Sequence, residues 1–246
     1  MKIVVVAGTS AIAEHCCRLW VARQPVDLTL VVRDVPKAEK IAADLRVRSP
    51  QSTVSIVKGD FLDPAAIGAL VSDVTASGPV DIALIAQGWL ADQQKSENDL
   101  AYCRESLEIN ALSPVLFAES FARYFRAAGR GTLAIIGSVA GDRGRKANYT
   151  YGAAKGFLAR YAEGMEHRLA GTGVKVVLIK PGPTESPMTS DIQAEGRRVA
   201  STEDVARTIV KGIERGSPVI YAPPIWQAIM LVVRHIPRFI FNKLSI

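Results

Sequence analysis

Short apolar runs without polar alternation recur along the chain, and longer segments with helical periodicity separate them. A continuous run of Val, Ile, Leu and Ala is typical of a parallel strand that is buried on both faces of its sheet. The pattern predicts seven such strands, at Ile3–Ala7, Leu28–Val32, Thr53–Val57, Ile82–Ala86, Thr132–Ile136, Val174–Ile179 and Val219–Tyr221.

The segments between these runs predict helices. Pro36 and Pro64 suit the first turn of a helix, and Ser201 suits an N-cap. A chain that alternates strand and helix favours an α/β fold, here a Rossmann-type, doubly wound parallel sheet with helices on both faces. Ligands bind to this architecture at the carboxyl ends of the strands. The expected helices are Ala11–Arg23, Pro36–Arg46, Pro64–Thr75, Asn98–Ala128, Tyr151–Ala170 and Thr202–Arg215.

Length and composition predict one globular domain. Of the 246 residues, 48% are hydrophobic and 22% charged, which suits a single domain over 1–221 with a C-terminal extension over 222–246. The three cysteines have no metal-ligand spacing, so we expect reduced thiols in the cytoplasm and no metal site. The net charge of +6 is modest and spread along the chain, and does not indicate nucleic acid as a partner. No apolar stretch reaches the roughly 18 residues of a transmembrane helix.

Three side chains with proton-transfer chemistry are expected to meet at one end of the sheet. Tyr151 and Lys155 are four residues apart on a predicted helix, so the phenol and the ammonium share one face. Ser138 follows a buried strand and can point to the same place. A hydroxyl, a phenol and a cation at one spot can move a proton to or from a carbonyl or an alcohol. Each residue alone is ordinary, but the combination indicates an enzyme.

The turn after the first strand is a candidate phosphate site. In the run Gly8-Thr-Ser-Ala-Ile-Ala13 a strand leads into a helix, where backbone N–H groups and the positive helix end can face a phosphate. Only one glycine of the dinucleotide-binding pattern G-x-G-x-x-G is present, so an ordinary strand-to-helix turn is the alternative. The candidate contacts in this run are Gly8, Thr9, Ser10 and Ile12.

Residues after the second and third strands bear on the choice of cofactor. An arginine such as Arg33 can bind the 2′-phosphate of NADP, whereas an acidic residue there binds the ribose of NAD. We therefore expect NADP, while Asp34, one position on, leaves NAD possible. Asp60, followed by Phe61, can accept a hydrogen bond from the adenine amino group.

Taken together, these motifs resemble the short-chain dehydrogenase/reductase family over nearly the whole chain. Tyr-x-x-x-Lys occurs often by chance, but the thirteen-residue spacing from Ser138 and the later Pro-Gly make the combination specific. The resemblance implies an NAD(P)-dependent oxidoreductase that reduces a ketone or oxidises a secondary alcohol, and a homo-oligomer, either a dimer or a tetramer. The motifs are Gly8–Ala13, Asp60-Phe-Leu-Asp63, Asn110, Ser138, Tyr151-x-x-x-Lys155 and Pro181-Gly-Pro-Thr-Glu-Ser-Pro-Met188.

The resemblance also implies a role for each matching residue. Tyr151 would be the general acid, and Lys155 would hold the nicotinamide ribose and lower the pKa of Tyr151 from about 10. Ser138 would hydrogen-bond the substrate oxygen, and Asn110 would anchor a water between Lys155 and solvent. Further cofactor contacts are expected at Ala86, Gly88, Pro181, Gly182, Thr184 and Ser186.

The chain departs from the family pattern in two places. The first turn is one residue short with alanines for its later glycines, and Ile85-Ala86-Gln87-Gly88 stands where the family has Asn-Asn-Ala-Gly. With the run Ser138–Gly144 and the apolar tail, these departures resemble a bacterial subgroup near the decaprenylphosphoryl-2-keto-ribose reductases, which use a lipid-linked keto-sugar. The same departures support the alternative of a non-catalytic dinucleotide-binding scaffold or regulatory protein.

Two segments near the C-terminus carry further expectations. Residues 183–200 are polar and follow the nicotinamide contacts, so we expect a lid over the substrate, with a plain surface loop as the alternative. Beyond Glu214 there is no acidic residue, and Arg234, Arg238 and Lys243 are interspersed with large apolar side chains. Such a tail is typical of peripheral contact with the inner face of an anionic membrane. A helix buried against the fold or a sister subunit is the alternative.

Overall fold

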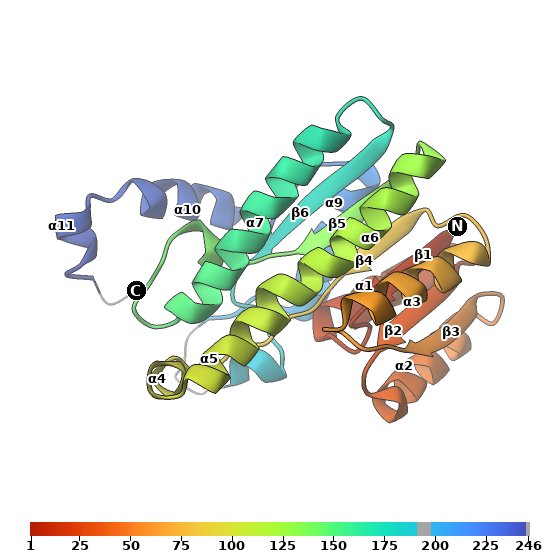
Figure 1. Ribbon diagram of the computed structural model, residues 1–246, viewed down its shortest axis with the longest axis horizontal. Coiled ribbons are helices and arrows are strands. Elements are labelled where there is room, and N and C mark those ends of the chain that lie inside the picture. Colours follow the sequence, from red (N-terminus) through yellow and green to blue (C-terminus); the bar gives the residue numbers. More distant parts are fainter. Residues whose placement is uncertain (191–197, 245–246) are drawn as a thin grey trace.

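A seven-stranded parallel sheet forms the centre of the molecule, in the order β3-β2-β1-β4-β5-β6-β7 (Figure 1). The computed structural model describes residues 1–190 and 198–244. Every predicted strand is present, with ends shifted by at most two residues. The order reverses at β1, which lies between β2 and β4, and this switch point is where such sheets bind ligands. The strands are β1 (Lys2–Val6), β2 (Asp27–Val32), β3 (Thr53–Lys58), β4 (Ile82–Ile85), β5 (Gly131–Ile136), β6 (Val174–Pro181) and β7 (Val219–Ala222).

Helices cover both faces of the sheet. In β1, Ile3 and Val5 belong to one hydrophobic core and Val4 and Val6 to the other, because successive side chains of a strand point to opposite faces. The first core lies under α1 (Ala11–Arg23), α2 (Val35–Arg48) and α9 (Thr202–Arg215). The second lies under α3 (Pro64–Ala76), α6 (Ser113–Ala128) and α7 (Tyr149–Leu169). The predicted doubly wound α/β fold is therefore confirmed.

Side-chain caps set the starts of several helices. Ser201 accepts a hydrogen bond from the Asp204 N–H and begins α9, which confirms the predicted N-cap. Asp63 accepts from the Ala65 N–H at 2.8 Å and begins α3. These bonds satisfy backbone donors that a helix start leaves without an intrahelical partner.

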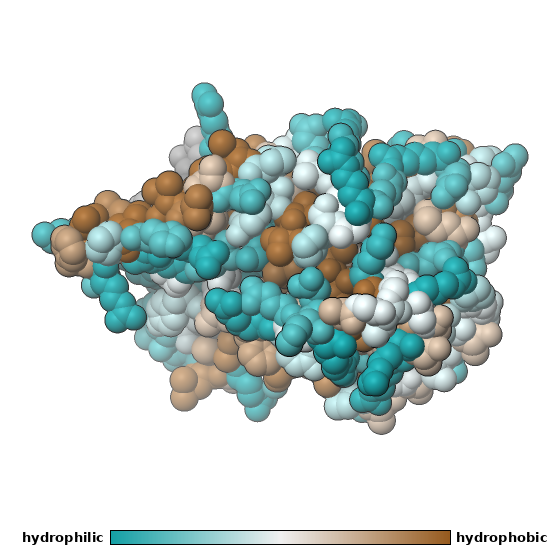
Figure 2. Space-filling view, turned by 90° about the horizontal axis from the view of Figure 1, so that it is seen from above, coloured by the Kyte–Doolittle hydropathy of each residue, from teal (hydrophilic) through white to brown (hydrophobic). Residues whose placement is uncertain are grey.

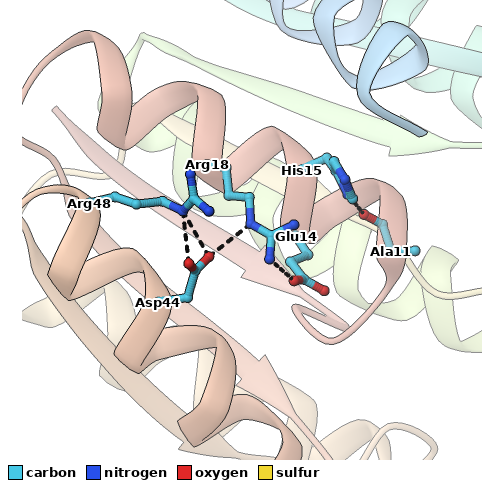
Figure 3. A network of polar contacts seen from close by, with 6 residues as sticks. All are labelled: Ala11, Glu14, His15, Arg18, Asp44 and Arg48. Carbon is cyan, nitrogen blue, oxygen red and sulfur yellow. Dashed lines mark hydrogen bonds and ion pairs between the residues drawn. The ribbon is translucent and has the colours of Figure 1, made fainter. Parts of the chain in front are cut away.

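A polar network ties α1 to α2 beside the first strand (Figure 3). Arg18 binds Glu14 at 2.6 Å on its own helix and Asp44 of α2 at 2.8 Å. Hydrogen bonds from Arg48 and Arg18 hold the pKa of Asp44 below its usual value. His15 Nδ1 lies 2.9 Å from the Ala11 carbonyl oxygen, so the histidine contacts its own helix. The network joins the solvent-facing sides of α1 and α2.

The helix expected over Asn98–Ala128 is interrupted. The short helix α4 (Gln93–Asn98) ends at Asn98, and Asp99, with extended backbone, caps α5 (Leu100–Leu107) through the Ala101 N–H. A π-helical turn, η1 (Glu108–Leu112), then connects α5 to α6. The predicted start was wrong because Asp99 begins a new helix. The π turn contains Asn110, and such turns are frequent at functional sites.

Two helices project from one end of the molecule, beyond the start of α7 (Figure 1). We call α10 (Ile225–His235) and α11 (Arg238–Phe241) the C-terminal arm. In α10 only Met230 is buried, so this helix is not covered within one chain. Among the residues described, no helix has the length and apolar character needed to cross a membrane.

Candidate active site

Two adjoining cavities lie at the carboxyl ends of the central strands. They share Ser10, Ala86, Gln87 and Gly88. The inner cavity, of about 190 Å³, contains the Ser138, Tyr151 and Lys155 side chains. The outer cavity, of about 270 Å³, extends past the first turn to Arg33 and Phe61.

The three residues predicted to carry proton transfer meet in the inner cavity. Ser138 follows β5 and caps the 3₁₀ turn η2 (Val139–Asp142) by accepting from the Ala140 N–H at 3.1 Å. Tyr151 lies in the first turn of α7, and its side chain lines the inner cavity together with that of Ser138. A carbonyl oxygen placed beside both hydroxyl groups could accept a hydrogen bond from each.

Glycines allow η2 to lie directly on the backbone of α7. A Cβ on Gly141 would come within 2.6 Å of the Lys155 carbonyl carbon, and one on Gly152 within 2.9 Å of the Ala140 oxygen. Real Cβ atoms do not approach so closely. This contact between two backbones puts Ser138 next to Tyr151.

Lys155 is held at the centre of the site by backbone groups. Its side chain is 1% exposed, and Nζ donates to the carbonyl oxygens of Gln87 and Ile136, each at 3.1 Å. Burial disfavours the charged form and lowers the pKa of Lys155 to about 7. The ammonium is therefore part of the wall of the inner cavity.

The pKa of Tyr151 is raised by burial, and its hydrogen bond with Ser138 acts in the opposite direction. Lys155 is directed to the two backbone carbonyls, and its expected lowering of the Tyr151 pKa stays a prediction. A raised pKa keeps the phenol protonated at neutral pH, as a proton donor requires.

Asn110 lies behind the cavities rather than in them. It is completely buried, its Oδ1 accepts from the Trp89 N–H at 2.9 Å, and its Nδ2 donates to the Trp89 carbonyl at 2.8 Å. Asn110 thus fixes the backbone just after Gly88, where a Cβ would come within 3.7 Å of Lys155 Nζ. Its expected role in anchoring a water stays a prediction.

Most of the predicted cofactor contacts line one or both cavities. The inner cavity is lined by Ser10, Ile12, Ala86, Gly88, Tyr151, Lys155, Pro181, Gly182, Thr184 and Ser186. The outer cavity is lined by Thr9, Ser10, Arg33, Phe61, Ala86 and Gly88.

Gly8 lines neither cavity. A Cβ there would lie 3.0 Å from Leu30 Cδ2, so Gly8 is needed for contact with β2. The positive φ of the turn, 59°, falls on Ala7. A residue with a side chain, and not the neighbouring Gly8, thus adopts the left-handed conformation in this turn.

Asp60 also lies outside both cavities and lines a separate hollow by β3 and α3. Its carboxylate accepts from the N–H groups of Leu62 at 2.7 Å and Asp63 at 3.1 Å. These hydrogen bonds lower the pKa of Asp60 and make it a turn-forming residue. The adenine contact expected for it stays a prediction.

The two cavities together fit an extended dinucleotide. At the outer end the Arg33 guanidinium lies 5.8 Å from the centroid of the Phe61 ring, while the Asp34 carboxylate caps α2 through the Lys37 N–H. The first turn of α1 borders both cavities through Ser10. Arg33, the start of α1 and Tyr151 thus lie in the order of the adenosine, pyrophosphate and nicotinamide parts of such a cofactor.

Several residues of the inner cavity were missed from the sequence. Arg145 and Asn148 belong to the loop between Ser138 and Tyr151, a position that could have singled them out. Gln87 and Met188 lie in the runs Ile85–Gly88 and Pro181–Met188, where no contact was expected of them, and Leu90 lies in no motif and reaches the cavity only through the fold. Among the described residues that line it, the charged ones are Arg145 and Lys155, both basic.

The expected lid is described only at its two ends. Thr184 pairs with Ala200 in a parallel bridge, and the Glu185 N–H donates to the Ala200 carbonyl at 2.8 Å. The 3₁₀ turn η3 (Pro187–Thr189) places Met188 on the inner cavity. Residues 191–197 of this segment lie outside the described residues.

Comparisons with known proteins agree with this geometry. A family model described as short chain dehydrogenase matches residues 1–197. An uncharacterized oxidoreductase of Streptomyces coelicolor is 32% identical over 100% of this chain and 96% of its own length. One of Mycobacterium tuberculosis is 31% identical over 98% of this chain and 96% of its own length. A short-chain dehydrogenase from Sphingobium yanoikuyae, solved with NADPH, has the same fold, with a TM-score of 0.81, 21% identity and 96% of each chain covered.

Proposed function

The chain belongs to the short-chain dehydrogenase family, and we propose that it reduces a ketone with NADPH, using Tyr151 as the general acid. As a member of this family it is an NAD(P)-dependent oxidoreductase. The proposal rests above all on the Ser138 and Tyr151 hydroxyl groups, which meet beside the buried Lys155 in one cavity.

The roles of the three side chains follow from their surroundings. Bound NADPH would supply the hydride to the carbonyl carbon. Tyr151, protonated at neutral pH, donates its proton to the carbonyl oxygen, and Ser138 donates a hydrogen bond to the same oxygen. Lys155, held by two backbone carbonyls, has a third N–H to offer to the nicotinamide ribose.

We propose that NADPH is preferred over NADH. The Arg33 side chain is exposed at the end of the outer cavity, where it can reach a 2′-phosphate. Asp34, which would favour the free ribose of NAD, is engaged at the start of α2. Thr9 and Ser10 would lie along the pyrophosphate, and Thr184 and Ser186 beside the nicotinamide.

We further propose that the substrate is a lipid-linked keto-sugar, as in the bacterial subgroup that the sequence resembles. Arg145 gives the inner cavity a cation beyond Lys155, and no carboxylate is present among the described residues that line it. A phosphate next to the sugar would be attracted to such a cavity. The apolar chain of this substrate would lie in a membrane.

A lipid-linked substrate requires the enzyme to work at a membrane surface. We propose that residues 1–221 form the reductase domain and that 222–246 contact the inner face of the membrane. The exposed apolar and basic side chains of the C-terminal arm support this placement. A homo-oligomer, dimer or tetramer, is compatible with it and is expected from the family.

The central test is Tyr151→Phe in an NADPH-oxidation assay with a panel of ketones, long-chain and phosphorylated ones included. We expect a loss of about 100-fold or more, the usual contribution of a general acid, with NADPH binding retained. Tyr149→Phe is the matched control, because Tyr149 is 48% exposed on the same helix and has Ala153, not a lysine, four residues on.

The possible outcomes separate the candidate functions. Turnover near wild type in Tyr151→Phe refutes the assignment of the acid. A wild-type protein that binds NADPH but turns over no ketone or secondary alcohol of the panel would favour the non-catalytic scaffold. Flotation with anionic liposomes, with and without residues 222–246, tests the membrane contact separately.

A further inference from the structure

Arg143 connects the turn that carries Ser138 to the C-terminal arm. Arg143 directly follows η2, and Ser138 is the N-cap of the same turn. Its guanidinium donates to the carbonyl oxygens of Val233 at 2.6 Å and Ile236 at 2.7 Å, and lies 3.7 Å from the centroid of the Phe241 ring. One side chain thus binds the end of α10 and stacks on α11.

The neighbouring residue ties the same turn to the base of the arm. Asp142 forms a buried ion pair with Lys180 of β6 at 2.6 Å, with the two side chains 3% and 8% exposed. It also accepts a hydrogen bond from the Tyr221 hydroxyl at 2.8 Å, and Tyr221 lies in β7, just before the arm. A buried pair of this kind fixes geometry, because losing either partner would leave an isolated charge.

The start of the arm packs against a residue of the inner-cavity wall. A Cβ on Gly182, which lines that cavity, would collide with the indole of Trp226 in α10. The arm therefore packs on the cavity wall through Trp226 and is bonded to the turn after Ser138 through Arg143. If α10 moves, at least one of these two contacts must change.

The outward face of the arm has the character of a lipid-binding surface. Ile225, Leu231, Val232 and Phe239 are each more than 60% exposed. Figure 2 shows the arm as a mostly brown, hydrophobic projection with teal, hydrophilic groups beside it. The basic residues are Arg234, Arg238 and Lys243, all exposed, and no acidic residue follows Glu214. This charge and apolar area complement an anionic bilayer.

We propose that Arg143 is a positioning residue through which the docking of the arm on an anionic lipid surface orders the turn that carries Ser138. The inference rests on the membrane contact of the proposed function and extends it to regulation of the site. Docking restricts the motion of α10 and α11, whose carbonyl and aromatic groups hold Arg143. The turn that carries Ser138 is then more ordered on the membrane than in solution, because lipid stabilises the arrangement in which the arm holds Arg143.

Hydrogen–deuterium exchange of the full chain tests this coupling without a known substrate. The probes are vesicles of phosphatidylcholine with phosphatidylglycerol and vesicles of phosphatidylcholine alone. In the wild type, anionic vesicles should slow exchange in residues 225–244 and also in 138–143, whereas neutral vesicles should have little effect. In Arg143→Met, slowing should persist in 225–244 and be lost in 138–143. Arg207→Met, an exposed arginine of α9, should behave as the wild type.

Arg143→Lys provides a second variant should the methionine variant unfold. A lysine keeps the charge but lacks the planar guanidinium that lies over the Phe241 ring while it bonds the carbonyls. Without lipid the two segments should therefore exchange faster together, by about tenfold for one charged interaction lost. Slowing of 138–143 that persists in the Arg143 variants overturns the coupling. Absence of any slowing in the wild-type arm overturns the membrane contact, and the Tyr151→Phe assay still decides the reductase assignment.

Discussion

Lys155 Nζ lies 5.8 Å from the centroid of the Tyr151 ring while it donates to two backbone carbonyls. The two side chains share one face of α7, but the cation is fixed by the ends of β4 and β5 and not by the phenol. The site thus combines a protonated tyrosine with a lysine whose pKa is lowered to about 7. This relationship leads to a prediction about pH.

The folding stability of the protein should depend on pH through Lys155. The pKa is about 7 in the folded state and about 10.5 in the unfolded chain, so the unfolded chain binds more protons between these values. The free energy of unfolding should therefore rise with pH in this window, by up to about 1.4 kcal/mol per unit. Guanidinium titrations at pH 7.5 and 8.5 should show this rise in the wild type and not in Lys155→Met. An unfolding free energy that changes equally with pH in the wild type and in Lys155→Met would contradict the lowered pKa of Lys155.

Asn110→Ala should reduce both stability and turnover. The variant leaves the Trp89 N–H and carbonyl without their buried partner, which should cost about 3 kcal/mol. Turnover should fall because the backbone after Gly88 relaxes, while the Kd for NADPH changes little. Asn98→Ala is the control, since Asn98 is exposed and its side chain donates to the Gln94 carbonyl of the same short helix. An unfolding free energy equal to wild type would exclude the proposed anchoring of Trp89.

Arg33→Ala should change the cofactor preference. Loss of a charge-assisted bond to the 2′-phosphate should raise the Kd for NADPH by about tenfold or more and leave that for NADH unchanged. Titration of protein fluorescence with each cofactor measures both constants. Arg23→Ala is the control, because Arg23 is exposed at the far end of α1 and pairs with Glu214. Equal weakening of both cofactors would argue against a phosphate contact.

Gly182→Ala should disturb the cofactor site through the arm. The added methyl group collides with the Trp226 indole, so Trp226 and the start of α10 must move. We expect a loss of about 1–3 kcal/mol in stability, weaker NADPH binding and altered tryptophan fluorescence. Gly68→Ala in α3 has open space around it and should gain up to about 1 kcal/mol. An unchanged fluorescence spectrum in Gly182→Ala would contradict the contact.

The fold was predictable because its strands are buried on both faces. Runs such as Val4–Val6 have no polar residue, and caps such as Ser201 are local, so short windows of sequence determine them. The Ser138, Tyr151 and Lys155 group was predictable from spacing on two adjacent elements. The start of α5 was missed because the helical periodicity continues across Asp99, whose side-chain cap and extended backbone separate α4 from α5.

Contacts between distant parts of the chain were not predictable. Arg143 and Val233 are 90 positions apart, and no local pattern relates an arginine to the carbonyl groups that end another helix. The left-handed conformation of Ala7 was missed because glycine is the usual residue there, and Gly8 stands next to it. In both cases tertiary packing decided the outcome.

The direct backbone contact between η2 and α7 has a consequence for protein engineering. At Gly141 and Gly152 every substitution adds atoms where none fit, so libraries that vary them would mostly yield proteins whose hydroxyl pair is forced apart. Leu90 and Met188 border the same cavity with side chains that can be exchanged for others. Selection for new ketones should therefore diversify Leu90 and Met188 and leave the two glycines untouched.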